Sequence, residues 1–269
     1  MSDRVVVTQS GGVADVRLNR PDKLNALDTS MFQALVETGA ARARDRGLRA
    51  VVLSGEGRAF CAGLDFASFA GLASGDAGRG PSLLSRDDSG SPANFAQRAA
   101  WIWTELPVPV IAAVHGVAYG GGLQIALAAD LRLVAPEARL SVMEIKWGLV
   151  PDMSGTQTLR RLVRLDVAKE LTYSGRVVSG TEAVALGLAT RCGDAPREAA
   201  LELAHEISTK SPDAIRAAKR LLDSSGVGGV AEGLRLEEEL QRSLIGRPNQ
   251  GEAVRANLEK RPPRFLDPD

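Results

Sequence analysis

The sequence predicts an α/β fold with a parallel sheet, and three observations support this prediction. Short aliphatic runs at 49–54, 110–114 and 131–134 are typical of buried strands. A glycine-rich turn and a helical segment at 123–129 separate the last two runs, as in a strand–helix–strand unit. After about Thr156, helical patterns replace strand patterns. With 269 residues, 44% of them apolar, the chain is long enough for one large domain with a sizeable core.

Local patterns predict the remaining elements. Two β-branched runs flank Gly11 and Gly12, which is typical of a hairpin. Asp28 or Thr29 is a suitable N-cap for the helix that follows, and Pro107 ends a later one. These expected elements are, in chain order, strands 4–9 and 13–19, helices 28–44, 95–106, 156–173 and 180–186, a strand near 188–192, and helices 196–209, 212–224, 230–245 and 249–260.

The stretch from Ala70 to Ser91 is rich in Gly, Ser and Asp and is longer than a loop in a compact domain normally is. Such loops are often lids or binding loops, or are disordered. We divide the chain into an α/β core over 1–195 and a helical region over 196–269. The last two helices are amphipathic, which suits packing on a neighbouring subunit as well as on the core.

Composition narrows the class of protein. Lys+Arg and Asp+Glu balance at 33 each, so no global field favours nucleic acid or an anionic membrane as a partner. Cys61 and Cys192 provide neither a disulfide framework nor metal-ligand spacing, and two histidines exclude a histidine-rich metal site. The first ten residues lack the apolar stretch of a signal peptide, and no run approaches a membrane span. We therefore expect a soluble cytoplasmic protein.

Two glycine-bearing segments each follow a predicted strand. Gly57–Asp65 comes after the 49–54 strand, and His115–Gln124, which contains three successive glycines, comes after the 110–114 strand. The carboxyl ends of strands are the usual location of ligand sites in α/β proteins. Glycines let the backbone approach a ligand and leave N–H groups free at a helix start. Two such bends can direct two N–H donors at one oxyanion, each contributing roughly 3–4 kcal/mol.

Taken singly, these segments have other interpretations. The glycine run is equally consistent with a tight turn or a phosphate cradle, and Gly63 with close packing. The run matches neither the dinucleotide-binding fingerprint nor a P-loop. The two segments together are what favour an oxyanion site.

These two segments, together with Asn19–Leu27, resemble motifs of the crotonase (enoyl-CoA hydratase/isomerase) superfamily. The similarity extends from about residue 4 to 265 and includes Gly155–Gln157 and Gly175–Gly187. It implies a crotonase-like spiral of ββα units with a C-terminal helical trimerisation region. It also implies a homotrimer or a dimer of trimers that acts on acyl-CoA, with no metal and no redox cofactor, since coenzyme A is part of the substrate.

The resemblance assigns roles to individual residues. The oxyanion-hole donors match the backbone N–H groups of Leu64 and Gly121. Other positions match contacts to coenzyme A, the last two often made across a subunit boundary; these are Lys23, Ala26, Ala62, Asp65, Lys260 and Phe265.

The acid/base positions distinguish the possible reactions. The hydratases of the family hold water between two glutamates, which match Gln124 and Glu144 here. An amide cannot exchange a proton at neutral pH, so Gln124 is a water or substrate contact at most. Asp152 stands where a hydratase usually has glycine. A Glu/Asp pair at this spacing resembles the dienoyl-CoA isomerases, although that branch usually has aspartate at the position of Gln124.

Each of these residues also has a structural interpretation. Glu144 could pair with Arg or Lys, Asp152 could cap the helix at 156, and Gln124 could be an inert residue of a first helical turn. Two carboxylates facing one apolar pocket acquire separated pKa values and can act as acid and base.

The sequence therefore indicates an enzyme that acts on unsaturated acyl-CoA thioesters through a stabilised enolate. Glu144 is the expected base and Asp152 the expected second proton shuttle. This pair favours double-bond isomerisation over hydration. Hydration with Glu144 as the single carboxylate is the alternative, and a non-catalytic acyl-CoA-binding subunit is an alternative of another class.

Other residues carry weaker signals. Cys61 has no histidine close in sequence to pair with, so we expect it to pack, as we do His115. Arg160, Arg161 and Arg164 form a basic helical face, solvated or between subunits. The segment before Gly155 does not match a nucleophile elbow, which disfavours a serine hydrolase. We expect the pocket wall to come from the 66–100 segment, through Phe66, Phe69, Leu83, Leu84, Phe95, Trp101 and Trp103.

Overall fold

The computed structural model describes residues 4–65, 83–86, 90–225 and 228–268. In this part of the chain the main sheet has the strand order β1-β2-β3-β4-β6-β9. Its first pair is antiparallel and the other pairs are parallel, which confirms the predicted hairpin and parallel α/β core. The strands are β1 (Val5–Ser10), β2 (Val13–Leu18), β3 (Ala50–Gly55), β4 (Val110–Val114), β6 (Leu131–Val134) and β9 (Arg191–Cys192).

Helices cover the sheet on both faces, which explains why β3 and β4 are buried along their whole length. Helices α1 (Thr29–Ala43) and α3 (Phe95–Glu105) pack together over the larger core cluster. Asp28 caps α1, and its side chain accepts a hydrogen bond from the Met31 N–H at 2.8 Å. On the opposite face, α8 (Pro196–Ser208) packs on β2, β3, β4 and β6.

A second, smaller sheet follows the order β5-β7-β8 among the described residues. It contains β5 (Val117–Tyr119), β7 (Arg139–Ser141) and β8 (Val178–Ser179). Strand β5 lies parallel to β7, and α4 (Gly121–Leu127) begins two residues after β5 ends. The sequence patterns did not predict these strands, since none is longer than three residues.

The C-terminal half is helical, as expected, but the segment expected as one helix over 156–173 forms two. They are α5 (Gly155–Leu162) and α6 (Leu165–Ser174), interrupted by extended backbone at Val163 and followed by α7 (Gly180–Leu186).

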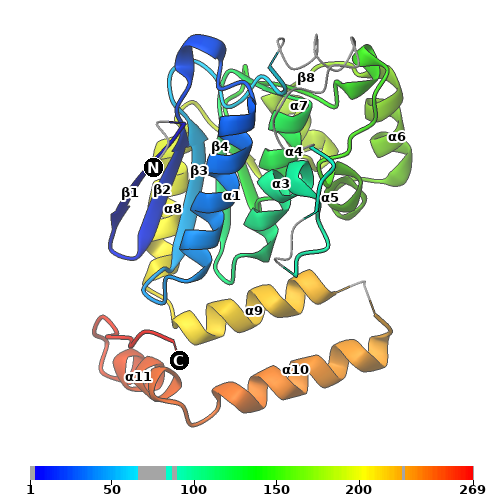
Figure 1. The fold of residues 1–269 in the computed structure, drawn as a ribbon. Helices are drawn as coiled ribbons and strands as arrows, with labels where there is room; N and C mark the ends of the chain where they lie inside the picture. The colour runs from blue at the N-terminus through cyan, green and yellow to red at the C-terminus, as the bar shows by residue number, and fades with distance from the viewer. Residues whose placement is uncertain (1–3, 66–82, 87–89, 226–227, 269) are drawn as a thin grey trace.

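The chain then continues as α9 (Pro212–Ser224), α10 (Val230–Leu244) and α11 (Pro248–Leu258), which lie apart from the sheet, below it in Figure 1. Helix α8, which the division at residue 195 assigns to the helical region, packs on the sheet, and its Ala200 and Ala204 are buried there. Within the described residues, no helix combines the length and apolar character needed to cross a membrane.

Candidate active site

A cavity of about 240 Å³ lies between α1, α3, the start of α4 and the 143–153 segment. Its wall is mainly apolar, and the titratable side chains in it among the described residues are Tyr119, Glu144 and Asp152. The lining residues are Phe32, Ala62, Gly63, Leu64, Leu83, Leu84, Ala96, Tyr119, Gly120, Gly121, Met143, Glu144, Trp147, Leu149, Asp152 and Met153.

Two backbone bends meet at this cavity. The segment at Cys61 pairs with β5, because the Cys61 N–H donates to Val117 O at 3.0 Å and Cys61 O accepts from the Tyr119 N–H at 3.1 Å. Gly63 has a φ of +87°, and a Cβ there would lie 2.7 Å from Tyr119 O and 3.8 Å from the Gly121 nitrogen. The bend that carries Leu64 therefore lies directly against the bend that carries Gly121.

The N–H groups of Leu64 and Gly121 have no hydrogen-bond partner among the described residues. Gly121 is the first residue of α4, where backbone N–H groups have no partner within the helix. On either side of Leu64 the backbone is paired with Leu27, whose N–H donates to Gly63 O at 2.8 Å. Both residues line the cavity, so two free N–H donors border the same space.

Glu144 is the buried carboxylic acid of the cavity wall. It follows β7 as the first residue of the 3₁₀ turn η2 (Glu144–Trp147) and is buried. Within the described residues it forms no ion pair, which argues against a structural partner for its charge. Its Oε1 accepts a hydrogen bond from Gln124 at 2.6 Å, whereas its buried Oε2 has no partner there. Burial raises the pKa of Glu144, and the charge of Asp152 raises it further.

Asp152 lines the same cavity but is an exposed residue, so it lies where the cavity opens to solvent. Although the residue is exposed, the protein surrounds its carboxyl group enough that desolvation raises the pKa of Asp152. The alternative that Asp152 caps the next helix does not describe the structure. Helix α5 begins after Ser154, and no side chain makes its N-cap hydrogen bond.

Gln124 lies behind the cavity wall rather than in it. Gln124 is not among the lining residues, so its expected contact with substrate or water stays a prediction, and its hydrogen bonds show that it is not inert. The side chain is 2% exposed, and its amide bonds Glu144 on one side and the backbone of Met153 and Gly155 on the other.

The expected coenzyme A turn lies beside the cavity. The Ala62 N–H donates to Leu24 O at 2.9 Å, which joins the turn that contains η1 (Pro21–Lys23) to the 62–64 bend. Ala62 lines the cavity, Ala26 is buried in the turn, and Lys23 is exposed on it.

Two residues hold this turn in place. Asp65 forms an ion pair with Arg20 at 2.5 Å, and therefore has a structural partner. Asn25, which sequence reasoning missed, is fully buried, and its side chain binds Ala59 O at 2.8 Å and the Arg20 N–H at 2.8 Å. The asparagine between Leu24 and Ala26 belongs to the motif at 19–27, but the motif's pattern does not reveal that role.

Lys260 and Phe265 lie in the segment after α11, outside the wall of this cavity. Figure 1 shows this end of the chain beyond α9, on the far side from α4. The structure does not bring these two residues together with the other predicted site residues within one chain.

The pocket wall differs in part from expectation. Leu83 and Leu84 line the cavity as predicted, whereas Phe66 and Phe69 lie outside the described residues. Residues missed at the sequence level, among them Trp147, come from the segment around Glu144 and form the opposite wall. Proximity in sequence to Glu144 was the signal that could have indicated them.

Three aromatic residues expected in the wall lie elsewhere. Trp103 is wholly buried in the core, and its Nε1–H donates to Ala99 O at 3.0 Å. Phe95 packs against Phe32 with ring centroids 6.1 Å apart, and Trp101 lines a separate cavity near α5. Helical spacing places these rings on a face of α3 but does not say whether that face meets the core or the ligand.

The two residues expected to pack behave as expected. The Cys61 thiol contacts Asn25 O at 3.1 Å, and burial raises its pKa to about 12, so the thiol is not a nucleophile. The Nε2 of His115 lies 2.9 Å from Gly57 O. No cluster of three or more His, Cys, Asp or Glu suited to a metal ion occurs in the described ranges.

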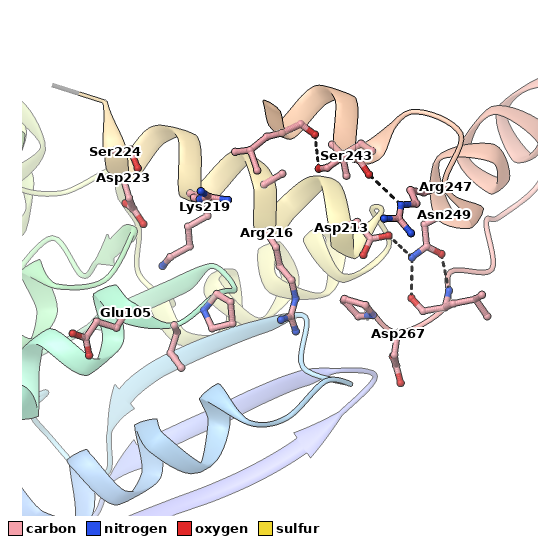
Figure 2. Close-up of a pocket in the computed structure, with 18 of the residues that line it drawn as sticks. Glu105, Asp213, Arg216, Lys219, Asp223, Ser224, Ser243, Arg247, Asn249 and Asp267 are labelled. Carbon is pink, nitrogen blue, oxygen red and sulfur yellow. Dashed lines mark hydrogen bonds between the residues drawn. The ribbon is translucent and has the colours of Figure 1, made fainter. Parts of the chain in front are cut away.

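A larger cavity, of about 640 Å³, lies between α9, α10, α11 and residues 104–107 (Figure 2). Two of its polar side chains have partners in the structure. Lys219 pairs with Asp130, which is not a lining residue, at 2.6 Å, and Asn249 donates a hydrogen bond to Asp213 at 2.8 Å. The free N–H pair and the Glu144 carboxylate lie in the smaller cavity, which is therefore the candidate active site.

Comparison with known proteins identifies the family of the chain. The family model described as enoyl-CoA hydratase/isomerase matches residues 8–268. Enoyl-CoA hydratase domain-containing protein 2, mitochondrial, from Homo sapiens is 34% identical over 273 residues, 98% of this chain and 88% of that protein. Methylglutaconyl-CoA hydratase, mitochondrial, from Mus musculus is 34% identical over 264 residues, 96% of this chain and 80% of that protein.

Solved structures show the same fold. The crystal structure of enoyl-CoA hydratase from Bacillus anthracis superposes with a TM-score of 0.88 at 30% identity, covering 98% of this chain and 100% of that one. This confirms the crotonase fold. Together with the match along nearly the entire sequence, it shows that the chain belongs to the enoyl-CoA hydratase/isomerase family.

Proposed function

We propose that this protein moves a double bond along the acyl chain of an unsaturated acyl-CoA thioester. The observation that carries the proposal is the composition of one apolar cavity, which combines two free N–H donors with two carboxylates of raised pKa. A carboxyl group of raised pKa is suited to exchange protons near neutral pH.

The N–H groups of Leu64 and Gly121 bind the thioester oxygen. Each donor stabilises the enolate oxygen by about 3–4 kcal/mol when water is excluded. That stabilisation acidifies the hydrogen on C2, next to the thioester carbonyl.

With a 3-enoyl substrate, Glu144 takes the proton from C2 and the electron pair spreads into a dienolate. Asp152 then protonates C4, which leaves a double bond between C2 and C3 and restores the thioester. The proton on Glu144 returns to Asp152 through solvent. Opposite protonation states of the two groups are needed, and their mutual charge favours them.

Hydration of a 2-enoyl thioester is the second candidate. The names of similar proteins favour hydration, because one sequence relative is a methylglutaconyl-CoA hydratase and one similar solved structure is that of an enoyl-CoA hydratase. In that reaction Glu144 would activate water for addition to C3. Glu144 would be the single carboxylate of that reaction, because the amide of Gln124 cannot exchange a proton at neutral pH.

The test is a panel of 2-enoyl-, 3-enoyl- and 3,5-dienoyl-CoA substrates, with products separated chromatographically. Isomerisation predicts movement of double bonds in the last two. Rapid hydration of the 2-enoyl-CoA substrate, with no movement of double bonds in the other two substrates, would defeat the proposal.

A variant tests the role of Glu144. In Glu144→Gln, kcat should fall by about 10²–10⁴-fold, whereas the matched change Glu137→Gln, at an exposed residue, should leave kcat unaltered. Tight binding without exchange of the C2 proton for deuterium would indicate a binding-only protein.

We also propose, from the family resemblance, a homotrimer or a dimer of trimers in the cytoplasm. Helix α10 supports an assembly, because Val230 and Leu234 are 81% and 58% exposed. Sedimentation velocity of the purified chain tests it.

A further inference from the structure

Gln124 makes three hydrogen bonds from a buried position on the first turn of α4. Its Nε2 donates to Glu144 Oε1 at 2.6 Å. Its Oε1 accepts from the backbone N–H groups of Met153 and Gly155, each at 2.8 Å. One side chain thus connects the helix that begins with Gly121, the base, and the loop that follows Asp152.

The orientation of this amide is forced by its surroundings. Two backbone N–H groups need an acceptor, and only the carbonyl side of an amide provides one. The NH₂ group must then face Glu144, whose Oε1 has to act as an acceptor. In the reversed orientation, the NH₂ group of the amide would face the two backbone N–H donors, and its oxygen would face the Glu144 carboxylate. Gln124 therefore occupies Oε1 and leaves Oε2 as the oxygen that exchanges protons.

The loop side of the contact is equally specific. Ser154, between the two donating residues, has a φ of +72°, a conformation that is costly for a residue with a side chain. A Cβ on Gly155 would lie 2.6 Å from Gln124 Oε1. The loop thus takes the shape that delivers two N–H groups to one oxygen, and this shape sets the backbone immediately after Asp152.

From these contacts we infer that Gln124 is the positioning residue of the acid/base pair: it fixes the carboxylate of Glu144 directly and Asp152 through the 153–155 loop. The inference rests on the proposed proton transfer at this site. A purely structural glutamine would contribute to stability but would leave the ionisation of Glu144 unchanged. If Gln124 positions Glu144, in contrast, its replacement changes both kcat and the pH dependence of the reaction.

The test compares Gln124→Met and Gln124→Glu with the control Gln157→Met, a change at an exposed glutamine on α5. The measurements are kcat, KM and the pH profile of C2 deuterium exchange with a saturated acyl-CoA, alongside thermal unfolding. Among the described residues, the other titratable side chains that line the cavity with Glu144 are Asp152 and Tyr119, whose hydroxyl accepts from Arg139 at 3.0 Å. No variant replaces Asp152, Tyr119 or Arg139.

Gln124→Met should lower kcat by at least about 100-fold through misplacement of the base, with KM changed by no more than about threefold. The acidic limb of the pH profile should move to higher pH. The Met side chain donates no hydrogen bond to ionised Glu144, so the pKa of Glu144 rises. The control should match wild type. A folded variant with wild-type kcat and an unmoved limb would overturn the inference.

If Gln124→Met does not fold, Gln124→Glu decides. Its carboxylate keeps an acceptor for both loop N–H groups but places a like charge beside Glu144. The acidic limb should then rise by about one pH unit or more, and an unmoved limb would again overturn the inference. Wild-type protein that exchanges no C2 proton would instead defeat the proposed function, and the inference with it.

Discussion

Replacing Gly63 by alanine tests the convergence of the two backbone bends. Gly63 has a φ of +87°, and an added Cβ would lie 2.7 Å from Tyr119 O, a backbone atom that cannot rotate away. Relief requires the 62–64 bend to move away from Tyr119. The same Cβ would lie 3.8 Å from the Gly121 nitrogen, so the movement separates the two N–H donors.

Gly63→Ala is expected to lower both the stability of the protein and kcat. The left-handed conformation costs an alanine about 1–2 kcal/mol of stability. Loss of one aligned oxyanion donor costs about 3–4 kcal/mol in the transition state, or roughly 10²–10³ in kcat. Since the donors act mainly on the enolate, KM should change far less than kcat.

The assay is C2 deuterium exchange and double-bond movement at saturating substrate, with unfolding followed by circular dichroism. Gly246→Ala is the matched control. Gly246 has a φ of +79°, but a Cβ added there would meet no heavy atom of the described residues within 4 Å. The control should share the loss of stability and keep wild-type kcat. If folded Gly63→Ala retained wild-type kcat, the oxyanion-hole assignment would be refuted.

Three further predictions concern ionisable groups. Burial raises the pKa of Glu144, which must be ionised to act, so kcat/KM should increase with pH around a midpoint above about 4.3; a midpoint at or below that value contradicts the burial argument. Asp152→Asn should lower isomerisation by about 10²-fold or more while C2 exchange persists, and equal losses in both would remove its separate role. Lys219→Met leaves Asp130 without its cation, so the free energy of unfolding in urea should fall by about 2 kcal/mol, less than for a wholly buried pair because Asp130 is partly exposed. An unchanged urea midpoint would show that this ion pair contributes nothing.

The sequence predicts the centre of the main sheet well because the strands there carry continuous aliphatic runs. Strands β3 and β4 are such runs, and both are buried throughout. The smaller sheet could not be predicted, since Val178–Ser179 and its partners are too short to show a period of two. The break at Val163 was missed for a similar reason, because no Pro or Gly marks it.

The site was predictable where its function resides in local backbone. Leu64 and Gly121 could be assigned from glycine-bearing bends and the family resemblance, and the structure brings them to one cavity. The contacts of Gln124 could not be assigned, because its loop partners lie 29 and 31 residues further along the chain. Trp103 shows the converse, since an aromatic residue expected in the pocket wall is wholly buried in the core.

The smaller sheet explains why Gly121, a proposed oxyanion donor, and Glu144, the proposed base, lie at one cavity. Tyr119 at the end of β5 pairs with Ser141 at the end of β7, and the Gly120 N–H donates to Ser141 O at 3.0 Å. Gly121 therefore follows this pair by two residues on one strand, and Glu144 follows it by three on the other. A slip of one residue would turn every side chain of the shifted strand to the opposite face. Chemistry at a carbonyl oxygen and its neighbouring carbon requires donors and base a fixed distance apart, and this short parallel pairing provides that spacing.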